Sequence, residues 1–185
     1  MSSRTIGNVL AGRYASDAVA TLWSPEYKIG LERRLWVAVL KAQQELGIPV
    51  PDAAAADYSA HLDDVDLASI ADRERITKHD VKARIEEFND LAGHEQIHKG
   101  MTSRDLTENV EQLQVRESLV IIRDKAVAAL AMLADLATLY RDLPMAGRSH
   151  NVAAQMTTLA RQATAIASTT ASTTPHAGAG KCGKP

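Results

Sequence analysis

The stretch MTSRDLTENVEQLQVRESLVIIRDKAVAALAMLADLATLYRDL, residues 101–143, decides the fold because it contains neither glycine nor proline. An uninterrupted run of this kind predicts one α-helix of ~40 residues, ~60 Å long at 1.5 Å per residue. Thr102 or Ser103 can cap its start, and Asp105 follows in the first turn, where an acidic side chain is favoured. We therefore expect a helix of at least ~30 residues between Thr102 and Tyr140.

The two halves of this helix differ in character. The first half is amphipathic, with Leu106, Val110 and Leu113 on one side and many charges between them. The second half, residues 127–139, is apolar nearly all round. A helix that is apolar on every side must be buried by several neighbours. This chain has few long helices, so we expect those neighbours to come from other subunits or from sequence outside this chain.

The rest of the sequence also predicts helices. Ser24-Pro25-Glu26 is a helix start, and Gly47 and Pro49 end that helix. Asp52, Asp66 and Asp80 can cap three further helices, which run to about Leu62, about Ile76 and Gly93. Pro144 ends the long helix, residues 145–151 read as a loop, and another helix starts near Val152. No segment alternates as a strand does, so the predicted fold class is all-α with no sheet.

Composition excludes several classes of protein. A net charge of −2 with 4% aromatic residues argues against nucleic-acid binding and against an anionic membrane surface. One cysteine excludes a disulfide scaffold and suits a reducing compartment. The most apolar stretch, residues 119–140, carries four charges, and the first 20 residues contain no apolar signal core. We expect a cytoplasmic protein that binds neither membrane nor nucleic acid.

One short motif suggests a metal site. His94-Glu95-Gln96-Ile97-His98 is a literal HExxH, in which two histidines on one helical turn can bind zinc. However, Gly93 and Gly100 bracket the motif, leaving under two helical turns, and no third ligand lies at the expected spacing. The favoured interpretation is a loop between two helices, with no metal or cofactor, while a zinc protein stays as the alternative.

Four other segments carry candidate binding or catalytic groups: Arg13-Tyr14, Lys78-His79-Asp80, His98-Lys99-Gly100-Met101-Thr102-Ser103-Arg104-Asp105 and Gly147-Arg148-Ser149-His150-Asn151. Arg13 and Tyr14 can clamp a phosphate, or can be ordinary surface residues. Thr102 and Ser103 can bind an anion at the start of the long helix, or can simply cap it. A histidine such as His150 can act as acid or base, but one in a loop usually has no catalytic role.

The order of these four segments resembles adenylosuccinate lyase, in the fumarase/aspartase superfamily. The similarity covers roughly residues 10–162, including Thr157-Thr158-Leu159, and ends after Gln162. It implies an N-terminal helical domain over 1–100, the start of a central helical bundle over 101–162, and an unrelated low-complexity tail over 163–185. That tail is dominated by Ala, Thr, Ser and Gly, and we expect it to be disordered.

The resemblance also implies a reaction and the residues that perform it. Fumarate would be eliminated from adenylosuccinate, giving AMP, and from the succinylated carboxamide ribotide of purine biosynthesis. By carry-over, Arg13 and Tyr14 hold the nucleotide phosphate, and Thr102 and Ser103 bind succinyl carboxylate oxygens. His150 is the general acid, and His79 supports catalysis or contacts phosphate, with Asp80 beside it. Ser149 replaces the threonine usual in the family and keeps its hydroxyl.

The resemblance leaves one part of the family's machinery unmatched. The family's catalytic base is a serine on a glycine-rich loop later in its sequence, and nothing in these 185 residues resembles that loop. We therefore expect a truncated chain that is inactive alone, from a homotetrameric enzyme whose sites are shared between subunits. The alternatives are another lyase of the superfamily, or a non-catalytic helical oligomerisation fragment.

Overall fold

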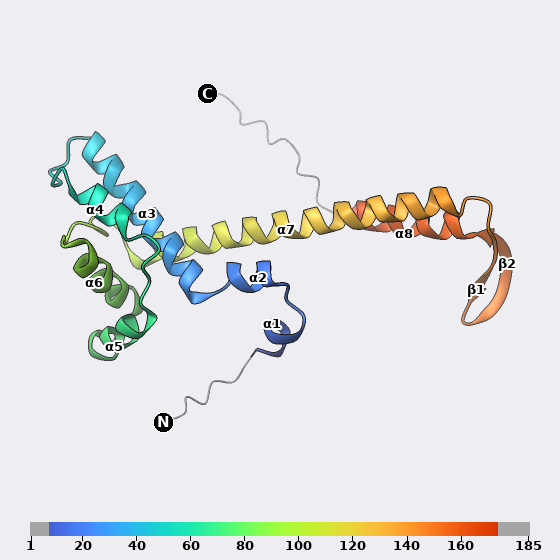
Figure 1. Ribbon diagram of the computed structural model, residues 1–185, viewed down its shortest axis with the longest axis horizontal. Helices are drawn as coiled ribbons and strands as arrows, with labels where there is room; N and C mark the ends of the chain where they lie inside the picture. Colours follow the sequence, from blue (N-terminus) through green and yellow to red (C-terminus); the bar gives the residue numbers. More distant parts are fainter. Residues whose placement is uncertain (1–7, 174–185) are drawn as a thin grey trace. The chain divides into compact units, whose positions relative to one another are not determined.

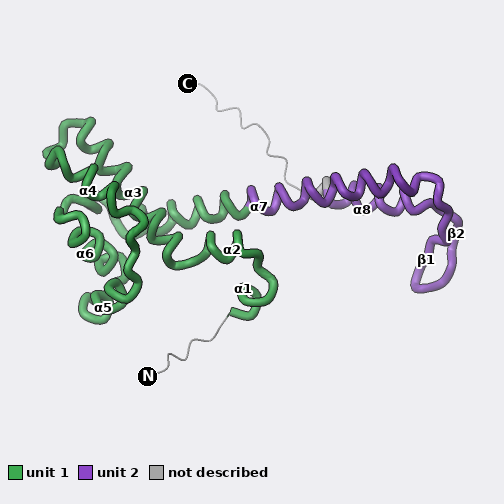
Figure 2. The backbone as a smooth tube through the Cα atoms, viewed as in Figure 1, with its two compact units in different colours: residues 1–118 green, residues 119–185 purple. Residues whose placement is uncertain are grey.

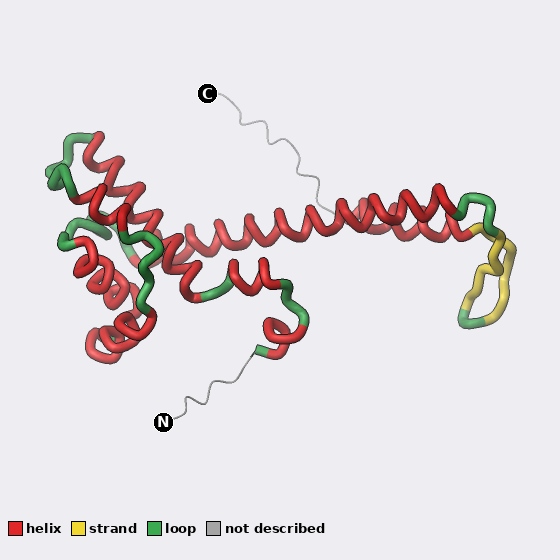
Figure 3. Tube along the Cα trace, viewed as in Figure 1, coloured by secondary structure: helices red, strands yellow, loops and turns green. Residues whose placement is uncertain are grey.

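The computed structural model describes residues 8–173 and contains helices and one small antiparallel sheet (Figures 1 and 3). The chain divides into two compact units, Met1–Ser118 and Leu119–Pro185, shown in different colours in Figure 2. The division falls inside the longest helix, α7. This division reflects packing within one chain. The domain boundary at residue 100 that the family resemblance implies therefore stays a prediction.

The first unit is built from short helices packed around α3. Their bounds are α1 Val9–Arg13, α2 Asp17–Leu22, α3 Pro25–Glu45, α4 Ala54–Ala60, α5 Leu67–Thr77 and α6 Asp80–Ala92, followed by the first part of α7, Ser103–Leu139. Sequence analysis missed α1 and α2, which are only five and six residues long. Helices this short have too little length to show an apolar period.

Local capping explains where most of these helices begin. The Ser24 hydroxyl accepts the Tyr27 N–H at the start of α3, and the Asp66 carboxylate accepts two N–H groups at the start of α5, as predicted. Two predicted caps were wrong. Helix α4 begins after Ala53, without a side-chain cap, because residues 51–53 already turn on backbone hydrogen bonds. Helix α6 is capped by His79 and not by Asp80.

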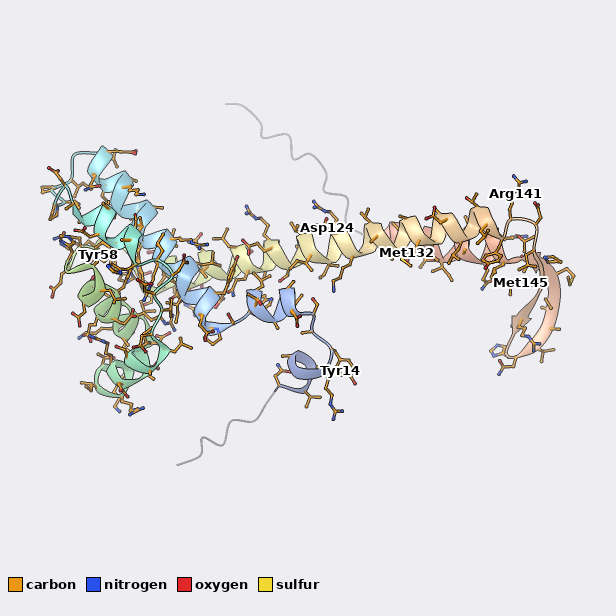
Figure 4. All side chains as sticks on the ribbon, viewed as in Figure 1. Tyr14, Tyr58, Asp124, Met132, Arg141 and Met145 are labelled. Atoms are coloured by element: carbon orange, nitrogen blue, oxygen red, sulfur yellow. The ribbon has the colours of Figure 1, made fainter. Side chains whose placement is uncertain are left out.

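The core of the first unit joins α3, α4, α6 and the start of α7. Trp36, Tyr58, Phe88 and Leu106 are each at most 1% exposed, and Tyr58 can be seen among the helices of this unit in Figure 4. The Tyr58 and Phe88 rings meet edge to face with centroids 4.9 Å apart. A contiguous apolar cluster of this kind lets the first unit bury its own hydrophobic face.

A buried ion pair also joins α3 to α6. Arg33, fully buried, pairs with Glu87, and its other guanidinium nitrogen donates to the His61 carbonyl at 2.6 Å. Its guanidinium also lies 4.6 Å from the centre of the Phe88 ring. Because a buried charge without a partner is very unfavourable, this pair fixes how α3 and α6 pack.

Helix α7 confirms the prediction made from residues 101–143. It has 37 residues, so it extends ~55 Å at 1.5 Å per residue. Its start is held by a reciprocal cap: the Asp105 carboxylate accepts the Thr102 N–H at 2.7 Å, and the Thr102 hydroxyl accepts the Asp105 N–H at 3.4 Å. The predicted capping role of Thr102 is therefore confirmed, with Asp105 as its partner.

The second unit contains the rest of α7, the strands β1 Pro144–Ser149 and β2 Val152–Thr158, and helix α8 Leu159–Thr173. The two strands form an antiparallel hairpin, so the predicted loop at 145–151 and the predicted helix start at Val152 were both wrong. His150 and Asn151 in the connection have positive φ angles of 49° and 66°. Two consecutive left-handed residues form the tight turn that suits a hairpin, and β-branched Thr157 and Thr158 suit a strand.

Helix α8 also corrects the expectation of a disordered tail. It continues to Thr173, so residues 163–173 are helical, while residues 174–185 of the predicted tail lie outside the described part of the chain. The Thr164 and Ser168 hydroxyls donate to carbonyls four residues earlier, which satisfies them within the helix. Alanine, the strongest helix former, occupies many of the remaining positions.

The apolar second half of α7 is largely exposed within this single chain. Val127, Met132, Leu136 and Leu139 are between 44% and 71% exposed, and Figure 4 shows the Met132 side chain on the helix surface. An exposed row of large apolar side chains is typical of a surface that is covered by a partner. Across residues 8–173, none of the helices combines the length and apolar character that a bilayer crossing needs.

Candidate active site

The turn between α5 and α6 positions His79 and Asp80. Lys78 ends α5 in the left-handed conformation, with φ 53°, and His79 follows in extended backbone. The His79 ring nitrogen Nδ1 accepts the Lys82 N–H at 3.3 Å and so caps α6. Asp80 lies beside it, with Oδ1 3.7 Å from His79 Nδ1, and its other oxygen pairs with Arg84 at 2.8 Å. Both predicted residues therefore stand at the start of one helix.

The start of α7 provides the second group of candidate residues. The Thr102 hydroxyl is engaged with Asp105, at 3.1 Å from its carboxylate oxygen. This hydrogen bond and the Thr102 backbone N–H, the stronger cause, lower the pKa of Asp105 below its ordinary value. The neighbouring Ser103 hydroxyl makes no hydrogen bond to any residue between 8 and 173, so it can bind a ligand without breaking an existing contact. The two hydroxyls thus differ in availability.

His98 begins the sequence segment that runs to Asp105, and it was not among the residues predicted to form the site. Its Nδ1 accepts the Trp36 indole N–H at 3.1 Å. Burial, the largest cause, lowers the pKa of His98, and the charge of Asp105 partly opposes this, while His79 adds to it. The sequence signal was present, because His98 stands at the head of the segment that contains Thr102 and Ser103.

Arg13 and Tyr14 lie at the end of α1. Tyr14 is 75% exposed, and its position at that helix end is labelled in Figure 4. The Tyr14 backbone N–H bonds to the Leu10 carbonyl, which closes the helix, while no side-chain hydrogen bond joins Arg13 or Tyr14 to the rest of residues 8–173. Both side chains are therefore available to a ligand, and the structure does not bring them into contact with His79 or Thr102.

Ser149 and His150 occupy the hairpin of the second unit. Ser149 ends β1, where it pairs with Val152, and His150 begins the turn, with both residues exposed. Arg148 stabilises this turn because its guanidinium donates to the Asn151 carbonyl at 3.1 Å. Gly147 beside it is tightly packed, since a Cβ there would lie 3.1 Å from the Gln155 carbonyl oxygen. The tight turn presents His150 at the tip of the hairpin.

The structure therefore brings some predicted site residues together and leaves others apart. His79 and Asp80 stand together at the start of α6, and Thr102 and Ser103 stand together at the start of α7. Arg13 and Tyr14 belong to the same unit without contacting them, and Ser149 and His150 belong to the other unit. The arrangement of the first unit combines an imidazole, hydroxyls and a helix start, which suits an anionic ligand.

The histidines of the HExxH segment point to different partners. His94 Nε2 lies 2.7 Å from an Asp57 oxygen, whereas His98 bonds with Trp36. The segment lies between α6 and α7 outside any helix, which confirms the predicted loop. Within residues 8–173 no three His, Cys, Asp or Glu side chains are grouped as a metal site would require.

Comparisons with known proteins define the class. Residues 19–174 match the profile of a protein family described as "Lyase". The chain is 34% identical over 160 residues to adenylosuccinate lyase of Saccharomyces cerevisiae, covering 84% of this chain and 33% of the relative. It is 29% identical over 160 residues to N-acetyl-S-(2-succino)cysteine lyase of Enterococcus italicus, covering 83% of this chain and 35% of that protein.

A solved structure agrees with these sequence matches. The crystal structure of a fumarate lyase from Mesorhizobium sp. BNC1 aligns with a TM-score of 0.75 and 29% identity, over 86% of this chain and 38% of that chain. The chain belongs to this lyase family, whose adenylosuccinate lyases it resembles, and its fold is all-α with one small hairpin. It spans about one third of the length of the curated relatives it matches. The family match also continues to residue 174, past Gln162 where we expected the similarity to end.

Proposed function

We propose that this chain forms part of a lyase that eliminates fumarate from adenylosuccinate, giving AMP, and from the succinylated carboxamide ribotide of purine biosynthesis. The observation that carries the proposal is the 34% identity to an adenylosuccinate lyase over 160 residues. The family match over residues 19–174 includes six of the eight candidate residues, and Arg13 and Tyr14 precede it. The local geometry supports it, because His79 caps α6 through one ring nitrogen and leaves the other available, and Ser103 stands at the start of α7, where an anion is favoured. The reaction belongs to the cytoplasm, and needs no cofactor in this proposal.

Each candidate residue has a proposed role in this reaction. Arg13 and Tyr14, with unengaged side chains, bind the nucleotide phosphate. Ser103 and Thr102 bind the succinyl carboxylate, for which Thr102 must share its hydroxyl with Asp105. His79, with Asp80 beside it, stabilises an anionic oxygen of the substrate.

The hairpin supplies the proposed acid. His150 protonates the departing nitrogen, and Ser149 orients the substrate or the imidazole through its hydroxyl. Its place at the tip of a tight turn leaves the ring accessible to a substrate. We place the complete site between subunits of a homotetramer, since this superfamily builds its sites that way and the second half of α7 exposes an apolar surface.

This chain by itself is proposed to lack lyase activity. No stretch of its sequence resembles the loop that carries the family's base, and loss of one acid–base group typically lowers a rate ~10²–10⁴-fold. The measurement is fumarate release from adenylosuccinate by the purified chain. Turnover in the range usual for enzymes, ~1–10³ s⁻¹, would show that these residues suffice and that the proposed dependence on further chain is wrong.

A chimera tests the assignment of His150. Residues 10–162 would replace the corresponding part of the full-length yeast adenylosuccinate lyase, and fumarate release would be followed with and without His150→Ala. We expect kcat to fall by about 10²-fold or more because the general acid is lost. The matched control is His61→Ala, since the His61 side chain pairs with Asp64 within the first unit and is not a candidate site residue. An unchanged kcat in His150→Ala would overturn its role.

Two other functions predict different results. A related lyase would leave adenylosuccinate intact and cleave another succinyl adduct. We choose N-acetyl-S-(2-succino)cysteine as the comparison substrate because it is named in the relative from Enterococcus italicus. If these residues serve only oligomerisation, the chimera should assemble correctly and still leave both substrates intact. Testing both substrates in the chimera therefore separates the three functions.

A further inference from the structure

The helix cap made by His79 determines which ring nitrogen carries its proton. Nδ1 accepts the Lys82 backbone N–H at 3.3 Å, so this nitrogen cannot itself be protonated while the cap is formed. In the neutral ring the single proton then belongs to Nε2. The ring nitrogen left for a ligand is therefore a hydrogen-bond donor and not a base.

A neighbouring carboxylate could reverse this arrangement. Asp80 Oδ1 lies only 3.7 Å from His79 Nδ1. A carboxylate free to approach would accept a proton held on Nδ1, and would thereby favour the opposite tautomer or the charged ring. The structure prevents this approach because Asp80 Oδ2 is bound by the Arg84 guanidinium at 2.8 Å.

Glu32 holds that guanidinium in place from another helix. Its Oε1 accepts from Arg84 Nη1 at 2.7 Å, so Arg84 bridges Glu32 of α3 and Asp80 of α6. Glu32 is completely buried, and Arg84 is the cation that it contacts. Burial, the largest cause, raises the pKa of Glu32, while the charge of Arg84 opposes that rise. A buried carboxylate with one cationic partner fixes that partner firmly.

We infer that Glu32 and Arg84 are positioning residues that restrain Asp80 and so hold His79 as the Nε2–H tautomer. His79 then offers a hydrogen-bond donor to an anionic oxygen, such as a carboxylate or phosphate oxygen of a substrate. The identity of that substrate rests on the proposed function, whereas the tautomer does not.

The tautomer can be read directly in the full 185-residue chain. Long-range proton–nitrogen NMR spectra distinguish the two ring nitrogens, and His79→Gln identifies the signals by their loss. At a pH well above the ordinary titration range of histidine, we expect wild-type His79 to be mainly the Nε2–H form. A ring found mainly as Nδ1–H would overturn the inference.

The decisive variant is Arg84→Lys, which keeps the positive charge but cannot bridge two carboxylates in one fixed geometry. We expect the ratio of Nε2–H to Nδ1–H forms to fall several-fold, because Asp80 is released toward the ring. Adding Asp80→Ala to Arg84→Lys should restore the wild-type ratio. Arg73→Lys is the matched control, because Arg73 of α5 forms an ion pair with Asp90 of α6. This substitution should leave the ratio of the two tautomers unchanged.

Glu32→Gln keeps the test falsifiable if Arg84→Lys loses helicity by circular dichroism. It retains the shape of Glu32 and removes its charge, so we expect a smaller fall in the same ratio. If neither variant changes the ratio more than Arg73→Lys does, the positioning role is wrong. The spectra need no substrate, so this outcome is distinguishable from failure of the lyase chimera, which concerns only the proposed function.

Discussion

The two units of this chain solve the problem of burial in opposite ways. The first unit buries Trp36, Tyr58 and Phe88 and pairs the fully buried Arg33 with Glu87. In the second unit, Met132 and Leu136 on α7 stay exposed at 68% and 44%. The comparison shows that a helix can form completely while its apolar side chains stay exposed. Backbone hydrogen bonds form within the helix, whereas burial of apolar side chains needs neighbouring elements.

The largest expected effect comes from the buried ion pair of the first unit. Arg33→Met leaves Glu87 as an unpaired buried charge and should destabilise the unit by about 3–5 kcal/mol. Urea unfolding followed by tryptophan fluorescence measures this, since both tryptophans, Trp23 and Trp36, lie in the first unit.

A neighbouring arginine supplies the control for this change. Arg34 pairs with Asp63 on the surface, where its side chain is 53% exposed. Arg34→Met should therefore change stability by no more than about 1 kcal/mol. Equal losses from Arg33→Met and Arg34→Met would show that the buried pair does not hold α3 against α6.

A matched pair of leucines on α7 compares the two units directly. Leu106 is fully buried in the first unit, so Leu106→Ala should cost about 2–5 kcal/mol in the same fluorescence measurement. Leu136 is 44% exposed in the second unit, so Leu136→Ala should change this transition by less than about 0.5 kcal/mol.

Leu136→Ala should instead weaken self-association in sedimentation experiments. Unchanged association would argue against the apolar face of α7 as an oligomer surface.

The cap of α7 predicts a smaller effect with a defined pH dependence. Thr102→Ala removes the hydroxyl that Asp105 engages and should cost about 1 kcal/mol of stability, whereas Thr102→Ser should not. Because the folded state lowers the pKa of Asp105, its stabilisation is present above the ordinary pKa of aspartate and is lost as pH falls through the lowered value. Thr102→Ala should partly flatten the pH dependence of the unfolding free energy in this acidic range, because the hydroxyl contact is lost while the stronger contact, from the Thr102 backbone N–H, remains. A steeper pH dependence in Thr102→Ala would contradict the cap.

The smallest expected effect concerns His98. Burial lowers its pKa, so the unfolded chain binds this proton more readily than the folded one. Stability should therefore be full above the ordinary histidine pKa of ~6.5 and decrease as pH falls toward the lowered value. His98→Gln should reduce this slope, while His61→Gln, a surface control, should keep it. A steeper slope in His98→Gln would show that the sign is wrong.

The sequence predicted those features that depend on neighbours along the chain. The absence of glycine and proline from 101–143 predicted α7, and Ser24 and Asp66 predicted the starts of α3 and α5 because a cap acts within three residues. The candidate residues came from motifs and their order. The hydrogen bond between His98 and Trp36 joins residues 62 positions apart, which no local pattern shows.

Tertiary structure decided the rest. Residues 152–158 contain good helix formers, yet they form β2, because pairing with β1 across the His150–Asn151 turn satisfies both backbones. Likewise, Arg84 reads as an ordinary surface residue of α6 until its contact with Glu32 from α3 is known. Local hydrogen bonding is encoded within a few residues, so the sequence alone determined helices α3, α5, α6 and α7. Contacts between distant segments depend on how those helices pack, so only the folded chain determines the hairpin and the surroundings of His79.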